Sequence, residues 1–345
     1  MMKLRILVLC AWVFSICLPL GFVTAQTFAG TGGTIKDDGS LNLYPLKVSG
    51  LPLATNEQFG LEKICVNIQH TWDSDVSIYL VAPDGAVAEL NRRNGDGGDN
   101  FTDCCFSPTA EVSINDGEPP FTGTYRPEVS FGGINNGQNP NGIWQLAILD
   151  IHPEEEGGRV INWQLTFGKN PAMPYFLAES KLPIVMIKSQ GEVVRDEPKS
   201  KVKMGIIDNG SGNLNHPTDP WNAFDGYAGM EYRGRSSQRH SKMSFGIETR
   251  DSVGQKPKAQ KLLDLPKESE FVLTANYSDK SLMRNVLAFD IARKMGHYAP
   301  RMRFVDLIID GEYRGVYLLG EKIKRGKNRV AISKLDKDDN DGDSL

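Results

Sequence analysis

Short runs in which apolar and polar residues alternate fill residues 26–168. In the run VSIYLV at 76–81, Val, Ile and Leu alternate with Ser, Tyr and Val, and the sequence PDG at 83–85 then turns the chain. A similar alternation spans 161–167, whereas GIWQLAILD at 142–150 is largely apolar and predicts a strand buried on both faces. Many short strands separated by Gly-, Asn- and Pro-rich turns indicate a β-sandwich of the jelly-roll type.

Apolar runs typical of strands continue after residue 181, beyond a proline-containing segment at 169–181 that indicates a linker. The expected strands cover residues 182–188, 201–208, 230–233, 243–250 and 271–275. A polar loop at 234–242 separates the third of these strands from the fourth.

One helix is predicted after these strands. Ser278 or Asp279 can cap its N-terminus, Arg293 and Lys294 fall in its last turn, and Gly296 ends it. Its apolar face comprises Leu282, Met283, Val286, Leu287, Phe289 and Ile291.

A hairpin is predicted next, because apolar strands at 304–309 and 312–319 flank Asp310-Gly311. An Asp-Gly pair between two such strands is a strong signal for a tight turn. Strands, one helix and a hairpin together predict an α+β lobe over residues 182–345.

The first 25 residues have the pattern of a secretory signal peptide. Two basic residues precede an apolar run at 6–23, and Val23-Thr24-Ala25 offers small residues for cleavage before Gln26. The run is short for a membrane anchor and is interrupted by a proline and a glycine. No later segment is apolar enough to span a bilayer. We therefore expect a secreted bacterial protein with no membrane span, and a mature length that suits two domains.

Three cysteines remain after the signal, at Cys65, Cys104 and Cys105. Three cysteines do not make a disulfide framework, so the apolar core must supply the stability. Because two of them are adjacent, at most one pairs readily with Cys65, and geometry decides whether it does. The five histidines are scattered and show no zinc-ligand spacing.

Charge is distributed unevenly along the chain. Residues 26–177 hold 8 Lys and Arg against 19 Asp and Glu, whereas residues 178–345 hold 29 against 24. The acidic first part fits calcium binding or plain solubility, and the slightly basic second part fits a phosphate-bearing ligand.

The first part resembles a known accessory domain. The segments HTWDSDVSIYLVAPDG (70–85), NPNGIWQLAILD (139–150) and GRVINWQLTFG (158–168) are similar to the proprotein convertase P domain, also called P/Homo B. The resemblance implies a β-sandwich over residues 26–168 that accompanies other domains and is not itself catalytic.

Aspartates in the turns of this sandwich are candidate calcium ligands. Asp73, Asp75, Asp96 and Asp99 lie in or beside turn-rich segments, and Asp103 follows closely. Carboxylate oxygens on flexible loops suit calcium, and the resemblance implies calcium in related domains. The alternative is that these residues only build turns.

The second part resembles a family of secreted kinases. The segments RGRSS (233–237), SKMS (241–244) and NYSDKSLMRN (276–285) precede FVDLIIDGEYRGVYLLGEKIKRGKNRV (304–330). In this order they are similar to the spore-coat protein H (CotH) kinase family, whose members are atypical protein kinases. The resemblance implies binding of ATP with Mg²⁺ and phosphorylation of Ser or Thr on an extracellular or coat protein.

A phosphoryl-transfer site needs cations on the phosphates and carboxylates that orient the cation and hold metal. The resemblance places the loop and the lysine of SKMS at the nucleotide, which makes Lys242 the candidate phosphate-binding lysine. Arg233 and Ser236 are further candidates in the same loop. A solvated lysine at the start of a strand is the alternative.

The remaining candidates come from the later segments. Asn276, Asp279 and Arg284 belong to the NYSDKSLMRN block, where a structural role, with Asp279 capping the helix and Arg284 paired to a buried acid, is as plausible as a nucleotide contact. Glu321 follows the hairpin and can orient Lys242 or bind substrate, or do neither if it is exposed.

The CotH resemblance also implies a later lobe with metal-holding acids, including a Trp-Asp-x-Asp element, and no Trp of this sequence lies in such an element. We expect the chain to be an incomplete kinase that binds nucleotide weakly and transfers no phosphate. The acidic run at 336–343 is then a loop before that lobe, since its Gly falls one place late for a calcium loop and no Glu follows.

Three other functions were weighed against the kinase. Proteolysis is rejected, although P domains accompany peptidases, because no G-x-S-x-G elbow or recognisable triad is present. Nucleic-acid binding is rejected, because no stacking aromatics interleave the basic residues at 322–329. A non-enzymatic surface, adhesion or coat-assembly protein stays open as the alternative.

Overall fold

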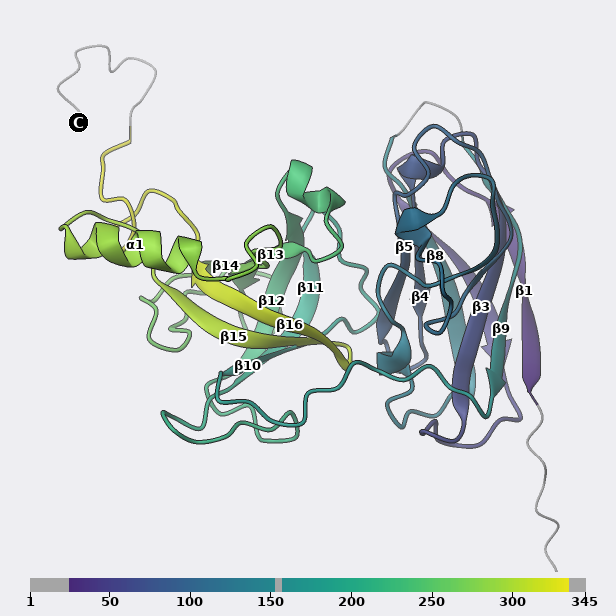
Figure 1. The fold of residues 1–345 in the computed structure, drawn as a ribbon, viewed down its shortest axis with the longest axis horizontal. Helices are drawn as coiled ribbons and strands as arrows, with labels where there is room; N and C mark the ends of the chain where they lie inside the picture. Colours follow the sequence, from purple (N-terminus) through teal and green to yellow (C-terminus); the bar gives the residue numbers. More distant parts are fainter. Residues whose placement is uncertain (1–24, 153–156, 335–345) are drawn as a thin grey trace, which may run out of the picture.

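The computed structural model describes residues 25–152 and 157–334. The predicted signal peptide, apart from its last residue, and the acidic run at 336–343 therefore lie outside the described residues. Figure 1 shows two β-rich bodies side by side, a sandwich formed by the first half of the chain and a barrel formed by the second. Within the described ranges, no helix is long and apolar enough to cross a membrane.

Two antiparallel-rich sheets form the sandwich. One sheet has the strand order β1 (Gln26–Thr34), β9 (Arg159–Gly168), β3 (Gly60–Gln69), β6 (Phe101–Phe106), β7 (Phe121–Tyr125). The other has the order β2 (Leu41–Val48), β8 (Gly142–Asp150), β4 (Val76–Val81), β5 (Val87–Arg92). Two short 3-10 turns, η1 (Asp73–Asp75) and η3 (Gly132–Ile134), lie on connections between the sheets, and a third, η2 (Ile114–Asp116), lies between β6 and β7 of the first sheet. The predicted β-sandwich is confirmed.

The apolar core between the sheets explains the sequence of β8. Trp144 is fully buried and its ring meets Phe167 of the opposite sheet at a centroid distance of 5.4 Å. The strand lies between β2 and β4, so nearly all of its second half is buried, as its apolar run predicts. Burial of such aromatic residues supplies most of the stability of the sandwich.

Strand β4 departs from its alternating sequence, because all six of its residues are buried. Ile78 and Leu80 face the core between the sheets, whereas Tyr79 and Val81 belong to a second apolar cluster on the outer face. Val193 from the second half of the chain completes that cluster. The outer face of this sheet is therefore covered by the barrel half of the protein.

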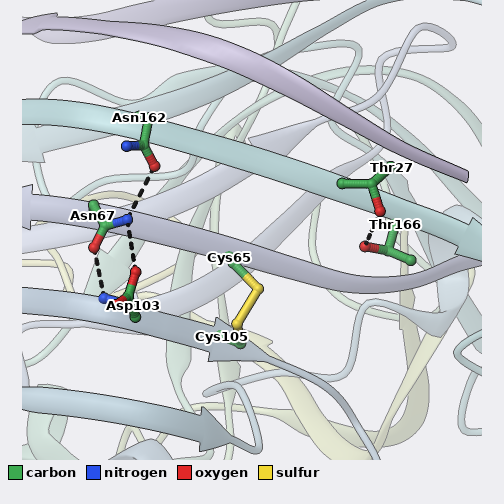
Figure 2. Close-up of a disulfide and its surroundings, with 7 residues drawn as sticks. All are labelled: Thr27, Cys65, Asn67, Asp103, Cys105, Asn162 and Thr166. Atoms are coloured by element: carbon green, nitrogen blue, oxygen red, sulfur yellow. Dashed lines mark hydrogen bonds between the residues drawn. A yellow bond between two sulfur atoms is a disulfide. The ribbon is translucent and has the colours of Figure 1, made fainter.

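In the sandwich, a disulfide joins strands β3 and β6. Cys65 of β3 and Cys105 of β6 face each other in register and are joined by a disulfide, and Cys104 is free and buried (Figure 2). On the same sheet, Asn67 donates to Asp103 Oδ1 at 3.1 Å and to Asn162 Oδ1 at 3.0 Å, which links three strands. Asp103 is therefore committed to the sheet and is separate from the turns around Asp73.

Seven strands close into a barrel in the second half of the chain. Their order is β10 (Ile184–Lys188), β11 (Ser200–Ile207), β12 (Phe224–Arg233), β13 (Ser244–Thr249), β14 (Glu270–Thr274), β16 (Glu312–Glu321), β15 (Met302–Ile309). The ring closes because β10 pairs in parallel with β15. Buried residues such as Met230, Phe245 and Leu319 fill its interior.

The helix α1 is shorter than its sequence predicts. It spans Arg284–Lys294 rather than starting near Asp279, because residues 276–283 form turns. None of its residues is buried, and Leu287 and Ile291 are 56% and 48% exposed, so the predicted apolar face has no core to pack on within the described residues. Figure 1 shows α1 at the end of the barrel remote from the sandwich.

The tip of the β15–β16 hairpin packs against the sandwich (Figure 1), and Glu312 is buried there. Asp310 accepts hydrogen bonds from the backbone nitrogen of Val87 at 3.2 Å and of Ser189 at 2.8 Å. Glu312 accepts from the backbone nitrogen of Gly133 at 2.9 Å and of Tyr175 at 2.8 Å. The predicted Asp-Gly turn is thus an inter-domain contact as well as a hairpin signal.

The backbone of the hairpin tip packs directly on Gly133 and leaves no room for a side chain there. A Cβ at this position would lie 2.9 Å from the Glu312 nitrogen and would clash with the Asp310 carbonyl oxygen. We predict that Gly133→Ala lowers the free energy of unfolding by about 1–3 kcal/mol, as overpacking typically does. Chemical denaturation measures the loss. Gly326→Ala is the matched control, since a Cβ there has nothing within 4 Å; equal stability of the two variants would contradict the prediction.

Removing the disulfide tests how much the sandwich depends on it. The bond closes 40 residues of chain, so we predict that the Cys65→Ala, Cys105→Ala double variant loses about 2–4 kcal/mol of unfolding free energy. Thermal or denaturant unfolding under non-reducing conditions measures this. The control is the wild type under reducing conditions, which should lose a similar amount; a loss below about 0.5 kcal/mol in both would show that the core alone suffices.

Candidate functional site around Lys242

Lys242 lies just before β13 and turns its side chain onto β16. Its ammonium donates to the carbonyl oxygen of Val316 at 2.6 Å and lies 4.6 Å from the centre of the Tyr317 ring. Burial lowers the pKa of Lys242, the charge of Asp306 opposes this, and that of Arg314 adds to it. The ammonium is thus half-buried, oriented, and still holds N–H groups that can reach an anion.

The loop before Lys242 needs a glycine. Gly234 has a φ of +115°, and a Cβ there would clash with the Ser237 hydroxyl. A short 3-10 turn, η4 (Ser236–Arg239), follows and brings the chain back toward β13. The sequence RGRSS is therefore a tight bend at the end of β12, in agreement with its predicted loop character.

Arg233 and Ser236 are both exposed. Arg233 lines a surface cavity of about 220 Å³ together with Glu231, Gly234 and Lys322. Lys242 lies instead against Val316 and Tyr317. The structure therefore assigns Arg233 and Lys242 to different surroundings.

The NYSDKSLMRN block satisfies its own polar groups. Asp279 accepts hydrogen bonds from the backbone of Ser281 at 3.1 Å and from the backbone nitrogen of Arg284, the first residue of α1, at 2.9 Å. The Arg284 side chain is 82% exposed and lies 3.6 Å from Asp279. Asn276, at a φ of +48°, donates to the Leu282 carbonyl at 3.0 Å. The block thus initiates the helix, and Arg284 pairs with Asp279 rather than with a buried acid.

Glu321 is buried, which excludes the alternative that it is an exposed residue after the hairpin. Its carboxylate accepts from the Arg301 backbone at 2.8 Å and side chain at 2.9 Å, and forms an ion pair with the buried Arg329. These two arginines account for both carboxylate oxygens. The arrangement stabilises the end of the barrel and leaves Glu321 with partners other than Lys242.

Family comparisons match the two halves of the chain. Residues 63–167 match the family model described as the proprotein convertase P-domain, and residues 230–342 match the model described as CotH kinase protein. The two matched segments lie in that order along the chain, and we refer to residues 26–168 as the P-domain and to residues 182–334 as the CotH domain. Both resemblances inferred from the sequence are confirmed in their stated order.

Curated relatives share only part of their length with this chain. Leupeptin-inactivating enzyme 1 of Streptomyces exfoliatus is 29% identical over 124 residues, which is 36% of this chain and 21% of that protein. Transglutaminase-activating metalloprotease of Streptomyces mobaraensis is 29% identical over 105 residues, 30% of this chain and 10% of that protein. The solved serine protease of Aeromonas sobria has a TM-score of 0.26 at 18% identity, covering 44% of this chain and 28% of that one.

Asp73 is the P-domain residue that best fits a cation. Its Oδ1 accepts from the Asn100 backbone at 2.9 Å, whereas its Oδ2 is buried without a hydrogen-bond partner. Burial raises the pKa of Asp73 to about 7, and the nearby charge of Asp99 adds to the rise. An orphaned, buried carboxylate oxygen is what a bound cation would satisfy.

The other aspartates do not gather around Asp73. Asp75 lies 3.6 Å from His152, and Asp96 and Asp99 are exposed. Across residues 25–152 and 157–334, no group of three or more His, Cys, Asp or Glu side chains is placed to hold a metal ion. Calcium at these residues stays a prediction that Asp73 alone supports.

A polar network that the sequence did not predict lies at the junction of the two domains. Arg92 of the P-domain pairs with Glu89 at 3.1 Å and with Glu128 at 2.7 Å, and both acids are buried with it. Tyr232 of the CotH domain donates to Glu89 at 2.7 Å. A signal was available in the strand VAELNR, where two charged residues and Asn91 lie among apolar ones, since charges in a buried strand require partners.

The buried carboxylates of the hairpin tip give the junction a pH dependence. Burial raises the pKa of Glu312 to about 7 and that of Asp310 to about 6. The folded protein therefore holds protons that the unfolded chain releases between about pH 4 and pH 7. The stabilisation is present at lower pH and is lost as the pH rises through this window.

We predict that the melting temperature of the wild type falls as the pH is raised from 5 to 8, and that Glu312→Gln reduces this slope. The reason is that the amide does not titrate, which removes a contribution of up to about 3 kcal/mol. Thermal unfolding across this pH range measures both slopes. Glu57→Gln, at an exposed position, is the control and should keep the wild-type slope; an unchanged slope in Glu312→Gln would contradict the assignment.

Proposed function

We propose that this is a secreted two-domain protein in which the CotH domain binds Mg–ATP and belongs to a phosphoryl-transfer system, with the P-domain as its accessory. The observation that carries the proposal is the half-buried, oriented ammonium of Lys242, eight residues after the Gly234 bend, within the segment that matches the CotH family model. Phosphate recognition requires a fixed cation near a backbone loop that approaches closely.

Each residue has a defined part in the proposed site. Lys242 would contact the phosphates with the N–H groups that Val316 leaves free, and Ser236 is exposed on the same loop. Mg–ATP, when bound, would supply the γ-phosphoryl group: the oxygen of a Ser or Thr hydroxyl of a protein substrate would bond to phosphorus as the bond to ADP breaks, and the hydroxyl proton would leave to solvent. Glu321, Asn276 and Asp279 support the fold around the site rather than the nucleotide.

A second candidate function is a binding module that performs no chemistry. The observation that favours it is that Glu321 and the NYSDKSLMRN block, which the kinase hypothesis needs near the nucleotide, are satisfied by structural partners. A surface or coat-assembly protein would keep the same barrel for stability alone. The two functions differ in whether Lys242 contacts a ligand.

Mg–ATP affinity of residues 26–345 separates the two functions. We predict that the wild type binds measurably and that Lys242→Ala weakens binding about tenfold or more, because it removes a charge-assisted contact. Isothermal titration measures the affinities. Lys294→Ala, on the exposed surface of α1, is the control and should leave affinity unchanged. No binding by the wild type, or equal affinity in the Lys242 variant, would favour the binding module.

A further inference from the structure

The loop at 234–242 is held at His240 from two sides. The His240 carbonyl oxygen accepts a hydrogen bond from Arg92 Nη2 of the P-domain at 3.0 Å. Its imidazole ring stacks on Tyr277, with ring centroids 4.6 Å apart. Lys242 lies two residues further along the chain, so the position of His240 limits where Lys242 can lie.

Arg92 is itself fixed. It is 8% exposed, and its guanidinium pairs with Glu89 and Glu128 while it donates to His240. Burial opposes the charge, yet the two carboxylates raise the pKa of Arg92 above its usual range. A planar guanidinium held by two buried carboxylates has a defined direction, so its bond to the loop is directional too.

The same network also holds the chain before the loop. Tyr232, near the end of β12, donates to Glu89 at 2.7 Å, and the Arg92 guanidinium lies 5.7 Å from the centre of its ring. Tyr232 precedes the Gly234 bend and His240 follows it. The P-domain therefore contacts both ends of the segment that leads to Lys242.

The charge of Arg92 acts on Tyr317, the residue whose ring Lys242 contacts. Burial raises the pKa of Tyr317 to about 12, and the positive charges of Arg314 and Arg92 act against this rise. Tyr317 is the residue whose ring lies 4.6 Å from the Lys242 ammonium, and its hydroxyl is buried without a hydrogen-bond partner. Tyr317 therefore lies within reach of the charge of Arg92 and in contact with Lys242.

We infer that the P-domain is the positioning element of the CotH domain's candidate nucleotide loop, and that Arg92 is its positioning residue. Arg92, fixed by Glu89 and Glu128, sets the conformation of residues 234–242 through His240, and with it the place of the Lys242 ammonium. The inference rests on the proposed function only in naming nucleotide as the ligand of the loop. Positioning of the loop itself can be tested without nucleotide.

Trypsin is a direct probe of the loop, because Arg235 and Arg239 lie within it. Two conservative variants weaken the junction from opposite sides: Arg92→Lys loses the fork geometry, and Tyr232→Phe loses only the hydroxyl that reaches Glu89. We expect cleavage within 234–242 to be about tenfold faster in Arg92→Lys, as loss of a charge-assisted bond to the loop predicts, and faster to a smaller degree in Tyr232→Phe. Tyr232→Phe retains the buried ion pairs, so it decides the question if Arg92→Lys does not fold.

Arg126→Lys is the matched control. Arg126 also donates to backbone carbonyls, those of Ala110 and Glu111, but these lie within the P-domain. Its variant should leave the loop cleavage rate at the wild-type value. Wild-type rates in both junction variants, or an equal acceleration in the Arg126 control, would overturn the inference.

Mg–ATP affinity supplies the second readout. If the wild type binds, the dissociation constant should rise about tenfold in Arg92→Lys and stay unchanged in Arg126→Lys. Faster cleavage with unchanged affinity would overturn the link between the loop and Lys242. If the wild type does not bind, the proposed nucleotide function fails, while the cleavage rates still decide whether the P-domain positions the loop.

Discussion

Packing of the β15–β16 hairpin tip against the sandwich joins the two domains. Two carboxylates, Asp310 and Glu312, lose water there and are satisfied by backbone N–H groups from the P-domain, the linking segment and β10's neighbouring turn. Separating the domains would leave those N–H groups and carboxylates to find new partners, which is costly for buried polar groups. Gly133 adds a steric requirement, because only a residue without Cβ admits the hairpin backbone.

The junction buries residues that an isolated domain would expose to solvent. In an isolated sandwich Tyr79 and Arg92 would lie on a solvated sheet face, yet here both are buried and Arg92 contacts the loop that leads to Lys242. The P-domain therefore contacts the CotH domain through buried polar side chains. It supplies the buried Arg92 guanidinium, which holds the His240 carbonyl two residues before Lys242.

Local patterns predicted much of the fold, because the alternation of β4 and β9, the apolar run of β8 and the Asp-Gly turn are all short-range signals. Closure of the barrel escaped prediction, since the parallel pairing of β10 with β15 joins residues over a hundred apart. The predicted start of the helix was wrong. The first helical residue is Arg284, and Asp279, five positions before it, accepts a hydrogen bond from its backbone N–H. The sequence left the exposure of Glu321 open, because its burial depends on Arg301 and Arg329, which no pattern in its own strand reveals.

The contacts across the junction predict that the P-domain and the CotH domain form one cooperative structure. Differential scanning calorimetry of residues 26–345 at pH 6 tests it most directly, because a two-state unit has equal calorimetric and van't Hoff enthalpies. The structure predicts a single transition with that equality. Two resolved transitions, each with its own van't Hoff enthalpy, would show that the domains unfold independently and would contradict the account.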